Sequence, residues 1–96
     1  MKTRVELDPQ VAAFVRSLAP EPRRRLREGL RGLESEAGDL QQLEADLAGY
    51  VRLRVSGYRV IVRFYAKAGA RMARCVFAER WAVVHELFSE ILRRHD

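Results

Sequence analysis

The feature that most constrains the fold is a pair of alternating apolar stretches at residues 50–65, joined at Ser56 and Gly57. Alternation of apolar and polar side chains indicates β-strands, and a two-residue turn fixes which residues stand opposite each other. In that register one face is wholly apolar, with these pairs: Val55 with Tyr58, Leu53 with Val60, and Val51 with Val62. The hairpin therefore needs another layer of the protein to cover this face.

The opposite face of the same hairpin is rich in arginine. The register places these pairs on it: Arg54 with Arg59, Arg52 with Ile61, and Tyr50 with Arg63. Like charges directly opposite each other on a sheet destabilise it, by roughly a few tenths of a kcal/mol to about 1 kcal/mol. Because a chain that only had to fold could scatter these arginines, we interpret the cluster as an anion-binding surface. The alternative is a solvated face whose long side chains avoid each other.

Two helices are predicted before the hairpin. After a weak edge-strand signal at residues 3–7, Asp8 and Pro9 are typical of a helix start, with Asp as N-cap and Pro at the first helical position. The Pro-Glu-Pro at residues 20–22 ends that helix and starts a second one, which Gly38 is expected to end. The linker that follows, with its leucines, is expected to hold a helical turn.

A third strand is predicted at residues 72–80. Regular alternation places one set of its side chains on a common face: Ala73, Cys75 and Phe77. The other face then carries Arg74, Val76, Ala78 and Arg80. We interpret Cys75 as a core residue rather than a nucleophile, since apolar neighbours raise the pKa of a thiol.

A helix is predicted at the C-terminal end, with an apolar stripe between residues 84 and 92. Trp81, at the junction of strand and helix, is interpreted as a packing anchor rather than a base-stacking platform. The expected fold class is α+β: two N-terminal helices packed on a small twisted antiparallel sheet, with a C-terminal helix. We expect one domain over residues 1–96.

The charge of the chain indicates a polyanionic partner. Lys and Arg number 18 against 13 Asp and Glu, which gives a net charge of +5, and Lys2 and Lys67 are the only lysines. Arginine presents a rigid fork of donors that fits phosphate oxygens, so nucleic acid is the expected partner. The alternative is a basic protein with no such partner.

Other classes of protein are excluded by what the sequence lacks. The single cysteine rules out a disulfide framework and a cysteine-based metal site within one chain. We find no signal peptide and no stretch near the roughly 20 apolar residues of a membrane span. A cytoplasmic protein without metal or other cofactor is therefore expected.

Two motifs resemble those of the RelE/ParE toxin superfamily. Residues 47–61, LAGYVRLRVSGYRVI, are similar to the central motif of that family, and residues 75–80, CVFAER, followed by Val84-His85-Glu86, are similar to its closing motif. The resemblance implies the toxin of a type II toxin–antitoxin system with a cognate antitoxin as partner. RelE-like members cleave mRNA in the ribosomal A site, whereas ParE-like members inhibit DNA gyrase.

The resemblance also implies a catalytic site. Basic residues of the RelE-like pattern fall at Arg52, Arg59 and Arg80, and His85 matches the proton-transfer position, which is commonly Tyr in that family. Histidine suits this role because its pKa is about 6.5. We expect the flanking cations to bind RNA phosphates: Arg54, Arg63 and Arg74.

Three functions remain open on sequence alone. A ribosome-dependent endoribonuclease would need the clustered arginines and His85. A ParE-like gyrase inhibitor would not depend on His85 or Arg80, and would use exposed helical or C-terminal surface instead. A noncatalytic RNA-binding protein would keep its RNA affinity after His85→Ala.

Overall fold

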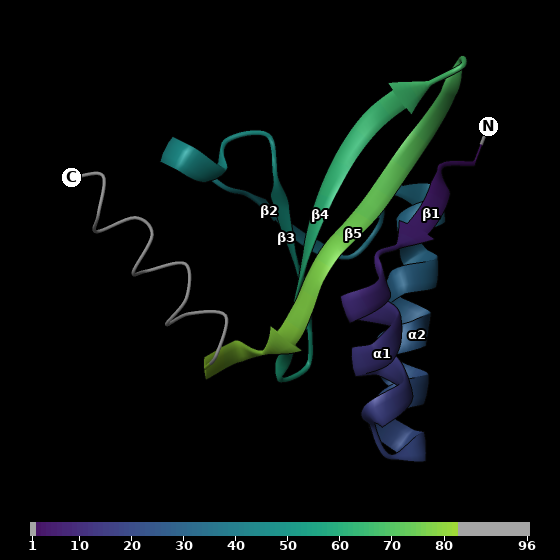
Figure 1. The fold of residues 1–96 in the computed structure, drawn as a ribbon, viewed down its shortest axis with the longest axis vertical. Helices are drawn as coiled ribbons and strands as arrows, with labels where there is room; N and C mark the ends of the chain where they lie inside the picture. Colours follow the sequence, from purple (N-terminus) through teal and green to yellow (C-terminus); the bar gives the residue numbers. More distant parts are fainter. Residues whose placement is uncertain (1, 83–96) are drawn as a thin grey trace.

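The computed structural model describes residues 2–82, which form a five-stranded sheet with two helices against one face (Figure 1). The strands are β1 (Arg4–Leu7), β2 (Asp39–Gln42), β3 (Val51–Val55), β4 (Tyr58–Lys67) and β5 (Ala70–Arg80). They lie in the order β1-β5-β4-β3-β2. β1 runs parallel to β5 and the other pairs are antiparallel. The prediction of an antiparallel sheet is wrong at β1, because so short a strand carries no sign of its partner's direction.

The helices α1 (Pro9–Ser17) and α2 (Pro20–Gly32) form the predicted hairpin on one side of the sheet (Figure 1). Each begins with a proline in its first turn, where the missing N–H costs nothing. Arg23 closes the connection between them, since its Nε and Nη2 donate to the Leu18 carbonyl at 3.1 and 2.8 Å. The two-helix layer predicted from the sequence is confirmed.

The β3–β4 hairpin has the predicted register. Its cross-strand pairs are Val55 with Tyr58, Leu53 with Val60, Val51 with Val62, Arg54 with Arg59, and Arg52 with Ile61. α2 lies very close to this hairpin at Gly29, where an added Cβ would be 2.5 Å from Cγ2 of Val55. Any larger residue would push the helix off β3, so the helical layer and the hairpin are fixed relative to each other.

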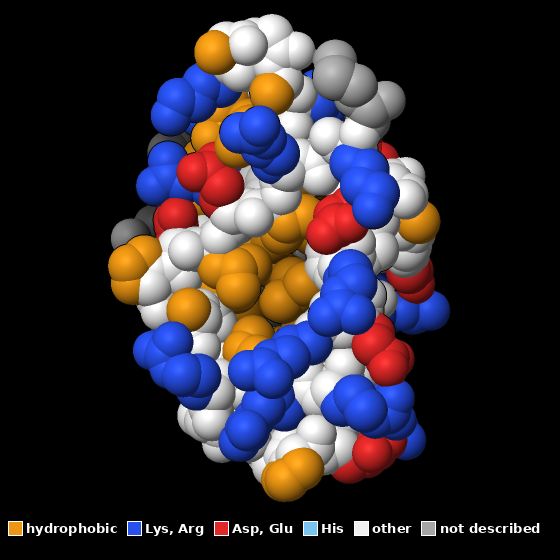
Figure 2. Space-filling view, turned by 90° about the vertical axis from the view of Figure 1, so that its right-hand side faces the viewer, with side chains coloured by type: hydrophobic (Ala, Val, Ile, Leu, Met, Phe, Trp, Pro, Cys, Tyr) orange, Lys and Arg blue, Asp and Glu red, His pale blue; other side chains and the backbone are white. Residues whose placement is uncertain are grey.

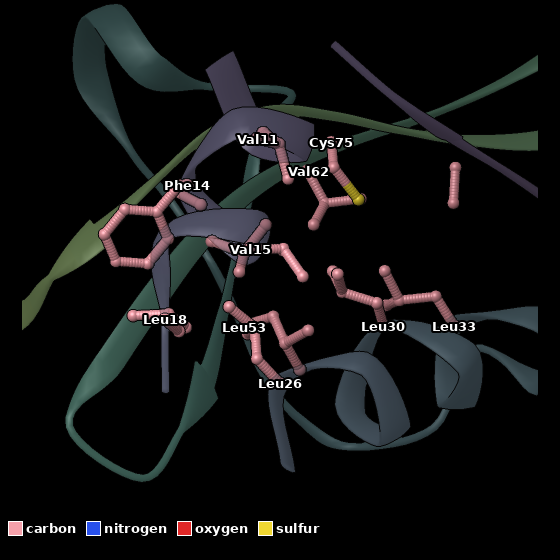
Figure 3. Packing of buried hydrophobic residues seen from close by; sticks show 13 residues of the cluster. Val11, Phe14, Val15, Leu18, Leu26, Leu30, Leu33, Leu53, Val62 and Cys75 are labelled. Carbon is pink, nitrogen blue, oxygen red and sulfur yellow. The ribbon is translucent and has the colours of Figure 1, made fainter. Parts of the chain in front are cut away.

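The core lies between the helices and the sheet. Figure 3 shows side chains from α1 and α2 meeting those of the strands, and the buried cluster is Val11, Phe14, Val15, Leu18, Leu26, Leu30, Leu33, Leu53, Val60, Val62, Ala73, Cys75 and Ala78. Truncating a buried leucine to alanine typically costs about 2–5 kcal/mol. In so small a protein, this cluster supplies most of the stability that holds the opposite sheet face in place.

A β-bulge interrupts β5 and changes which residues share a face. Ile61 pairs with Phe77, but the next residue, Val62, pairs with Cys75, so Val76 is an extra residue in the strand. After the bulge, Ala78 faces the core. The predicted alternation is therefore wrong beyond Cys75: Ala73 and Cys75 are buried as expected, whereas Phe77 crosses to the other face.

The segment after α2 also differs from the prediction. α2 ends at Gly32, before the predicted Gly38, and a 3-10 turn covers Leu33–Ser35. Glu36 ends this turn in the left-handed conformation, with φ 50°, and Gly38 follows with a φ of 126°. The expected helical turn is present at Ala45–Leu47. β2 was not predicted, because its sequence DLQQ has no strong strand preference and it forms by pairing with β3.

Two further predictions concern the C-terminal helix and the expected absence of a membrane span. The C-terminal helix at residues 84–92 lies outside the described residues. Within residues 2–82, no helix is long and apolar enough to cross a membrane.

Candidate nucleic-acid interface

The sheet face turned away from the helices carries the arginine cluster, and we call it the arginine face. Four side chains define it, two from β3 and two from β4: Arg52, Arg54, Arg59 and Arg63. Each lies between residues whose side chains point to the core, because successive residues of a strand point to opposite faces. Because the apolar side chains of β3 and β4 pack into the core, the arginines between them must point to the opposite face.

Arg59 is the most enclosed residue of this face, with only 9% of its surface exposed. Its Nη1 donates to the carbonyls of Ser56 at 3.1 Å and Tyr58 at 2.9 Å, which holds the guanidinium against the turn. Burial lowers the pKa of Arg59 below its ordinary value, and the neighbouring Arg52 and Arg54 lower it further, with Asp39 acting in the opposite sense. The surroundings therefore disfavour its positive charge in the absence of an anion.

Arg52 and Arg59 share an unusual feature. The Nε of each is buried and makes no hydrogen bond, and within residues 2–82 neither side chain forms an ion pair with a carboxylate. Buried polar groups are nearly always hydrogen-bonded, so an unsatisfied N–H points to strain or to a function. Two adjacent guanidinium groups with unused donors match the oxygens of a phosphate.

Arg54 lies beside this pair but already has an acidic neighbour. Its Nε is 2.7 Å from Oδ2 of Asp39, which stands directly opposite it on β2. Both side chains are about half exposed, 55% and 46%, and exposed ion pairs contribute only about 0–1 kcal/mol. An RNA phosphate can therefore replace Asp39 at small cost.

The other end of the face is more nearly neutral. Arg63 stands directly opposite Arg74, and the Nε of Arg74 is 2.8 Å from Oδ1 of Asp8. Asp8 raises the pKa of Arg74 through a hydrogen bond and its charge. Asp8 thus occupies the predicted N-cap position of α1 without capping it with its side chain. Arg74 is on the arginine face as expected, but its charge is already balanced.

Tyr65 and Glu6 add a second contact at this neutral end. The Tyr65 hydroxyl donates to Oε1 of Glu6 at 2.5 Å, and this hydrogen bond raises the pKa of the phenol. A phenol with a raised pKa is a poorer proton donor and is less often ionised. The candidate reactive region is therefore the other end, around Arg52, Arg54 and Arg59.

Arg80 is not brought to that region. It is the last residue of β5 and stands opposite Tyr58, whose ring packs edge-on against Phe14 of α1 on the helix side of the sheet. Its guanidinium is 67% exposed, and its Nη1 is 3.7 Å from Oε1 of Glu79. His85 lies outside the described residues, so the structure gives no position for the predicted proton-transfer group.

Glu79 is a candidate that the sequence analysis missed. The bulge puts it directly opposite Arg59 on the arginine face, where its Oε1 accepts the backbone N–H of Arg80 at 3.1 Å. A carboxylate next to a phosphate-binding arginine can accept a proton during catalysis. No signal in the sequence pointed to it, because regular alternation places Glu79 on the core side.

The remaining candidates for reactivity are accounted for. Cys75 is fully buried, as predicted, and burial, with a smaller contribution from Asp8, raises the pKa of its thiol to about 12. It is therefore not a nucleophile at neutral pH. Residues 2–82 contain no group of three or more His, Cys, Asp or Glu side chains placed to hold a metal ion.

Comparison with known proteins identifies the fold. No family model and no curated protein matches the sequence. Among solved structures, the chain resembles the RelBE2 toxin–antitoxin complex of Mycobacterium tuberculosis, with a TM-score of 0.69 and 18% identity over 83% of this chain and 99% of that one. It also resembles the RelE–RelB complex of Pyrococcus horikoshii, with a TM-score of 0.63 and 26% identity over 83% and 96% of the two chains.

A third likeness extends over nearly the whole sequence. The E. coli toxin RelE, a doubly substituted variant in the free state, matches with a TM-score of 0.59 and 21% identity over 98% of each chain. The molecule is thus a small α+β protein with a helical hairpin on one sheet face and clustered cations on the other. The fold of the chain is the one found in these RelE structures.

Proposed function

We propose that this chain is the toxin of a type II toxin–antitoxin system and an endoribonuclease that cleaves mRNA in the ribosomal A site. The observation that carries the proposal is the pair formed by Arg52 and Arg59, each with a buried Nε that has no hydrogen-bond partner. The superfamily supports a toxin, since the similar structures are RelE-type toxins, several of them bound to RelB. The arginine pair supports RNA chemistry because it matches a phosphodiester.

The proposed reaction needs no group outside the chain and the RNA. The ribose 2′-oxygen attacks the adjacent phosphorus, the bond from phosphorus to the 5′-oxygen breaks, and a 2′,3′-cyclic phosphate and a 5′-hydroxyl remain. The 2′-hydroxyl gives its proton to a base and the leaving oxygen receives one from an acid. Arg52 and Arg59 stabilise the additional negative charge on the phosphorane, since their donors are held in place before the reaction begins.

The proton transfers are assigned to two groups. Glu79, opposite Arg59, is suited to accept the proton of the 2′-hydroxyl, since a carboxylate next to the reacting group can act as a general base. His85, the position implied by the family motif, is proposed as the acid that protonates the leaving oxygen. Arg54 and Arg63 would bind the flanking phosphates. Arg74, which is paired with Asp8, and Arg80, which lies opposite Tyr58, would add only long-range positive charge.

An antitoxin is the proposed protein partner. The complexes from M. tuberculosis and P. horikoshii contain one, and the arginine face would attract an acidic segment that folds on binding. Occupation of the face by carboxylates would satisfy the free donors of Arg52 and Arg59 and exclude RNA. We place this hetero-oligomer in the cytoplasm, where both mRNA and ribosomes are available.

The test is primer extension on a reporter mRNA in a purified translation system, with naked RNA as a parallel sample. New 5′ ends at A-site codons that need both ribosomes and this protein would support the proposal. Arg59→Gln should remove them, whereas Arg24→Gln, on the exposed side of α2, should not. Intact mRNA during active translation would reject the nuclease, and a gyrase supercoiling assay would then test the ParE-like alternative.

A further inference from the structure

A second concave site lies around the end of the sheet from the arginine face. It has a volume of about 560 Å³ and is formed by the start of α2, the β3–β4 turn and the end of β5. The residues that matter for its chemistry are Arg25, Tyr58, Arg80 and Trp81. None of the assigned roles on the arginine face, apart from a distant contribution by Arg80, involves this pocket.

Trp81 gives the pocket an aromatic surface. It is 50% exposed, one of two large hydrophobic side chains that stand out to solvent within residues 2–82. Its backbone N–H donates to the Gly57 carbonyl at 2.9 Å, which ties the residue to the β3–β4 turn. The interpretation of Trp81 purely as a packing anchor leaves half of its surface unexplained. An aromatic side chain that is fixed at its backbone and open to solvent can stack on a nucleic acid base.

Two arginines line the same pocket as this ring. Arg25 comes from α2 and Arg80 from β5. Each forms an ion pair with a carboxylate: Arg25 with Glu21, which also lines the pocket, at 3.4 Å, and Arg80 with Glu79 at 3.7 Å. The side chains of both arginines are more than half exposed, and exposed ion pairs contribute only about 0–1 kcal/mol, so a phosphate can replace either carboxylate at small cost. An apolar ligand has no need of these cations. Aromatic surface flanked by arginine is the combination that binds single-stranded nucleic acid, with stacking for bases and charge for phosphates.

The pocket and the arginine face share the β3–β4 turn. Arg59 donates to the carbonyl of Ser56 from one side of the sheet, while Ser56 and Gly57 line the pocket on the other side. An RNA strand with a phosphate at Arg52 and Arg59 can therefore continue around this turn. This continuity favours RNA over a protein segment as the occupant.

We propose that the pocket binds one unstacked base of the RNA strand whose phosphate lies at Arg52 and Arg59, with Trp81 as the stacking surface. The proposal rests on the proposed RNA-cleaving function and adds a subsite to it. Arg25 and Arg80 bind the phosphates on either side of that base. The subsite orients the strand, so that the scissile phosphate arrives at the arginine pair in one direction.

Trp81 makes the proposal measurable, because it is the only tryptophan in the chain. Its fluorescence, excited where tyrosine does not absorb, reports on this pocket alone. The probe is a 2′-O-methyl RNA trinucleotide, which lacks the attacking hydroxyl and cannot be cleaved. We expect saturable quenching by the trinucleotide and none by inorganic phosphate at the same concentration.

Variants of the full chain then separate stacking from charge, with affinity measured by anisotropy of a labelled trinucleotide. Trp81→Ala should raise the Kd about tenfold, within the range for loss of one base–aromatic stack, and Trp81→Phe should restore most of the affinity. Arg25→Gln should raise the Kd several-fold, whereas Arg31→Gln, on the same helix but outside the pocket, should not. A trinucleotide with one abasic position should bind to the wild type as weakly as the intact one binds to Trp81→Ala.

Two outcomes would overturn the base subsite. One is an unchanged Kd in folded Trp81→Ala or equal binding of the abasic probe. The other is quenching by an acidic antitoxin peptide but not by RNA, which would assign the pocket to the protein partner. Both are distinguishable from failure of the proposed function, because that failure appears as intact mRNA with the wild-type chain, whatever the state of the pocket.

Discussion

Arginines lie on α2 and on the arginine face, and the two surfaces differ in whether carboxylates pair with them. On α2, Arg24 forms ion pairs with Glu21 at 2.6 Å and Glu28 at 2.7 Å, one turn away in each direction. The hydrogen bond and charge of Arg24 lower the pKa of Glu21. Figure 2 shows blue and red side chains interspersed on the helix side. On the arginine face, neither Arg52 nor Arg59 forms an ion pair with a carboxylate of the described residues.

The difference shows that the number of arginines says little about function, and that their pairing says more. Helical spacing lets a carboxylate reach a guanidinium at i,i+3 or i,i+4, so Arg24 of α2 has an acidic partner on either side along the helix. In the hairpin, Arg54 is held opposite Arg59 by a register that the core imposes. The arginine face therefore stays charged at the expense of stability, which is typical of sites that bind anions.

The largest expected effect is the loss of cleavage on removing either arginine of the pair. Arg52→Gln and Arg59→Gln should each reduce the rate of mRNA cleavage by about 10²–10³-fold, the usual effect of losing one preorganised donor to a transition state. Arg24→Gln should leave the rate within about twofold, because its charge is already balanced. Single-turnover cleavage on stalled ribosomes measures all three. Equal losses in the three variants would show that the two surfaces act alike.

A smaller effect is expected at Glu79, the carboxylate that faces Arg59. Glu79→Gln should reduce cleavage by about 10²-fold at neutral pH, the lower range for loss of a general base. Glu79→Asp, which keeps a carboxylate, should retain more of the rate than Glu79→Gln, and single-turnover cleavage on stalled ribosomes measures both. An unchanged rate in Glu79→Gln would remove Glu79 from the mechanism and leave the proton transfers to His85.

Removing an arginine from the arginine face should reduce cleavage but increase the free energy of unfolding, whereas removing one from α2 should not increase it. Arg52→Met removes a charge next to Arg59 and a buried N–H without a partner, so we expect it to stabilise the free protein by about 0.5–1 kcal/mol. For a domain of this size, that corresponds to a rise in Tm of roughly 2–8 °C. Arg24→Met, which breaks two ion pairs, should not raise Tm. A lower Tm for Arg52→Met would show that the arginine face carries no strain.

The smallest effect concerns a paired charge remote from both surfaces. The carboxylate of Glu36 accepts hydrogen bonds from Arg71 and from the Thr3 hydroxyl, and these lower its pKa from the ordinary value of 4.5. Its contribution to stability is therefore present above that value and is lost as the pH falls through the lower, folded-state pKa. Glu36→Gln should have a slightly lower Tm than the wild type at pH 7 and an equal one in strong acid.

The matched control is Glu44→Gln, since Glu44 is exposed and forms no ion pair within residues 2–82. Thermal unfolding followed by circular dichroism across the acidic range suffices for the comparison. A difference between wild type and Glu36→Gln that persisted in acid would mean that the amide is worse for a reason other than charge.

Sequence reasoning succeeded where local chemistry determines the structure. The Ser56–Gly57 turn and the alternation around it fixed the register of β3 and β4, so Arg52, Arg54 and Arg59 were placed correctly together. The two helices followed from proline at their starts and from the spacing of apolar residues. These features depend on residues close to each other in the chain.

It failed where the outcome depends on a distant partner. The parallel direction of β1 depends on its pairing with β5, and β2 is a strand because it pairs with β3. The extra residue Val76 has no signature of its own, because valine suits a regular strand as well as a bulge. For that reason, Arg80 was expected beside Arg59 and Glu79 was not. The roles of all these residues, His85 included, await the experiments above.

The extra residue in β5 has a consequence for comparison with the RelE structures that share this fold. Here Glu79, the fourth residue after Cys75, stands opposite Arg59. In a relative without the bulge, the third residue after the Cys75 position would stand there. At the identities found among these structures, 18–26%, an ungapped alignment can therefore exchange the equivalents of Ala78, Glu79 and Arg80. Residue roles are best transferred across the superfamily by strand pairing, with a gap at Val76, rather than by counting along the chain.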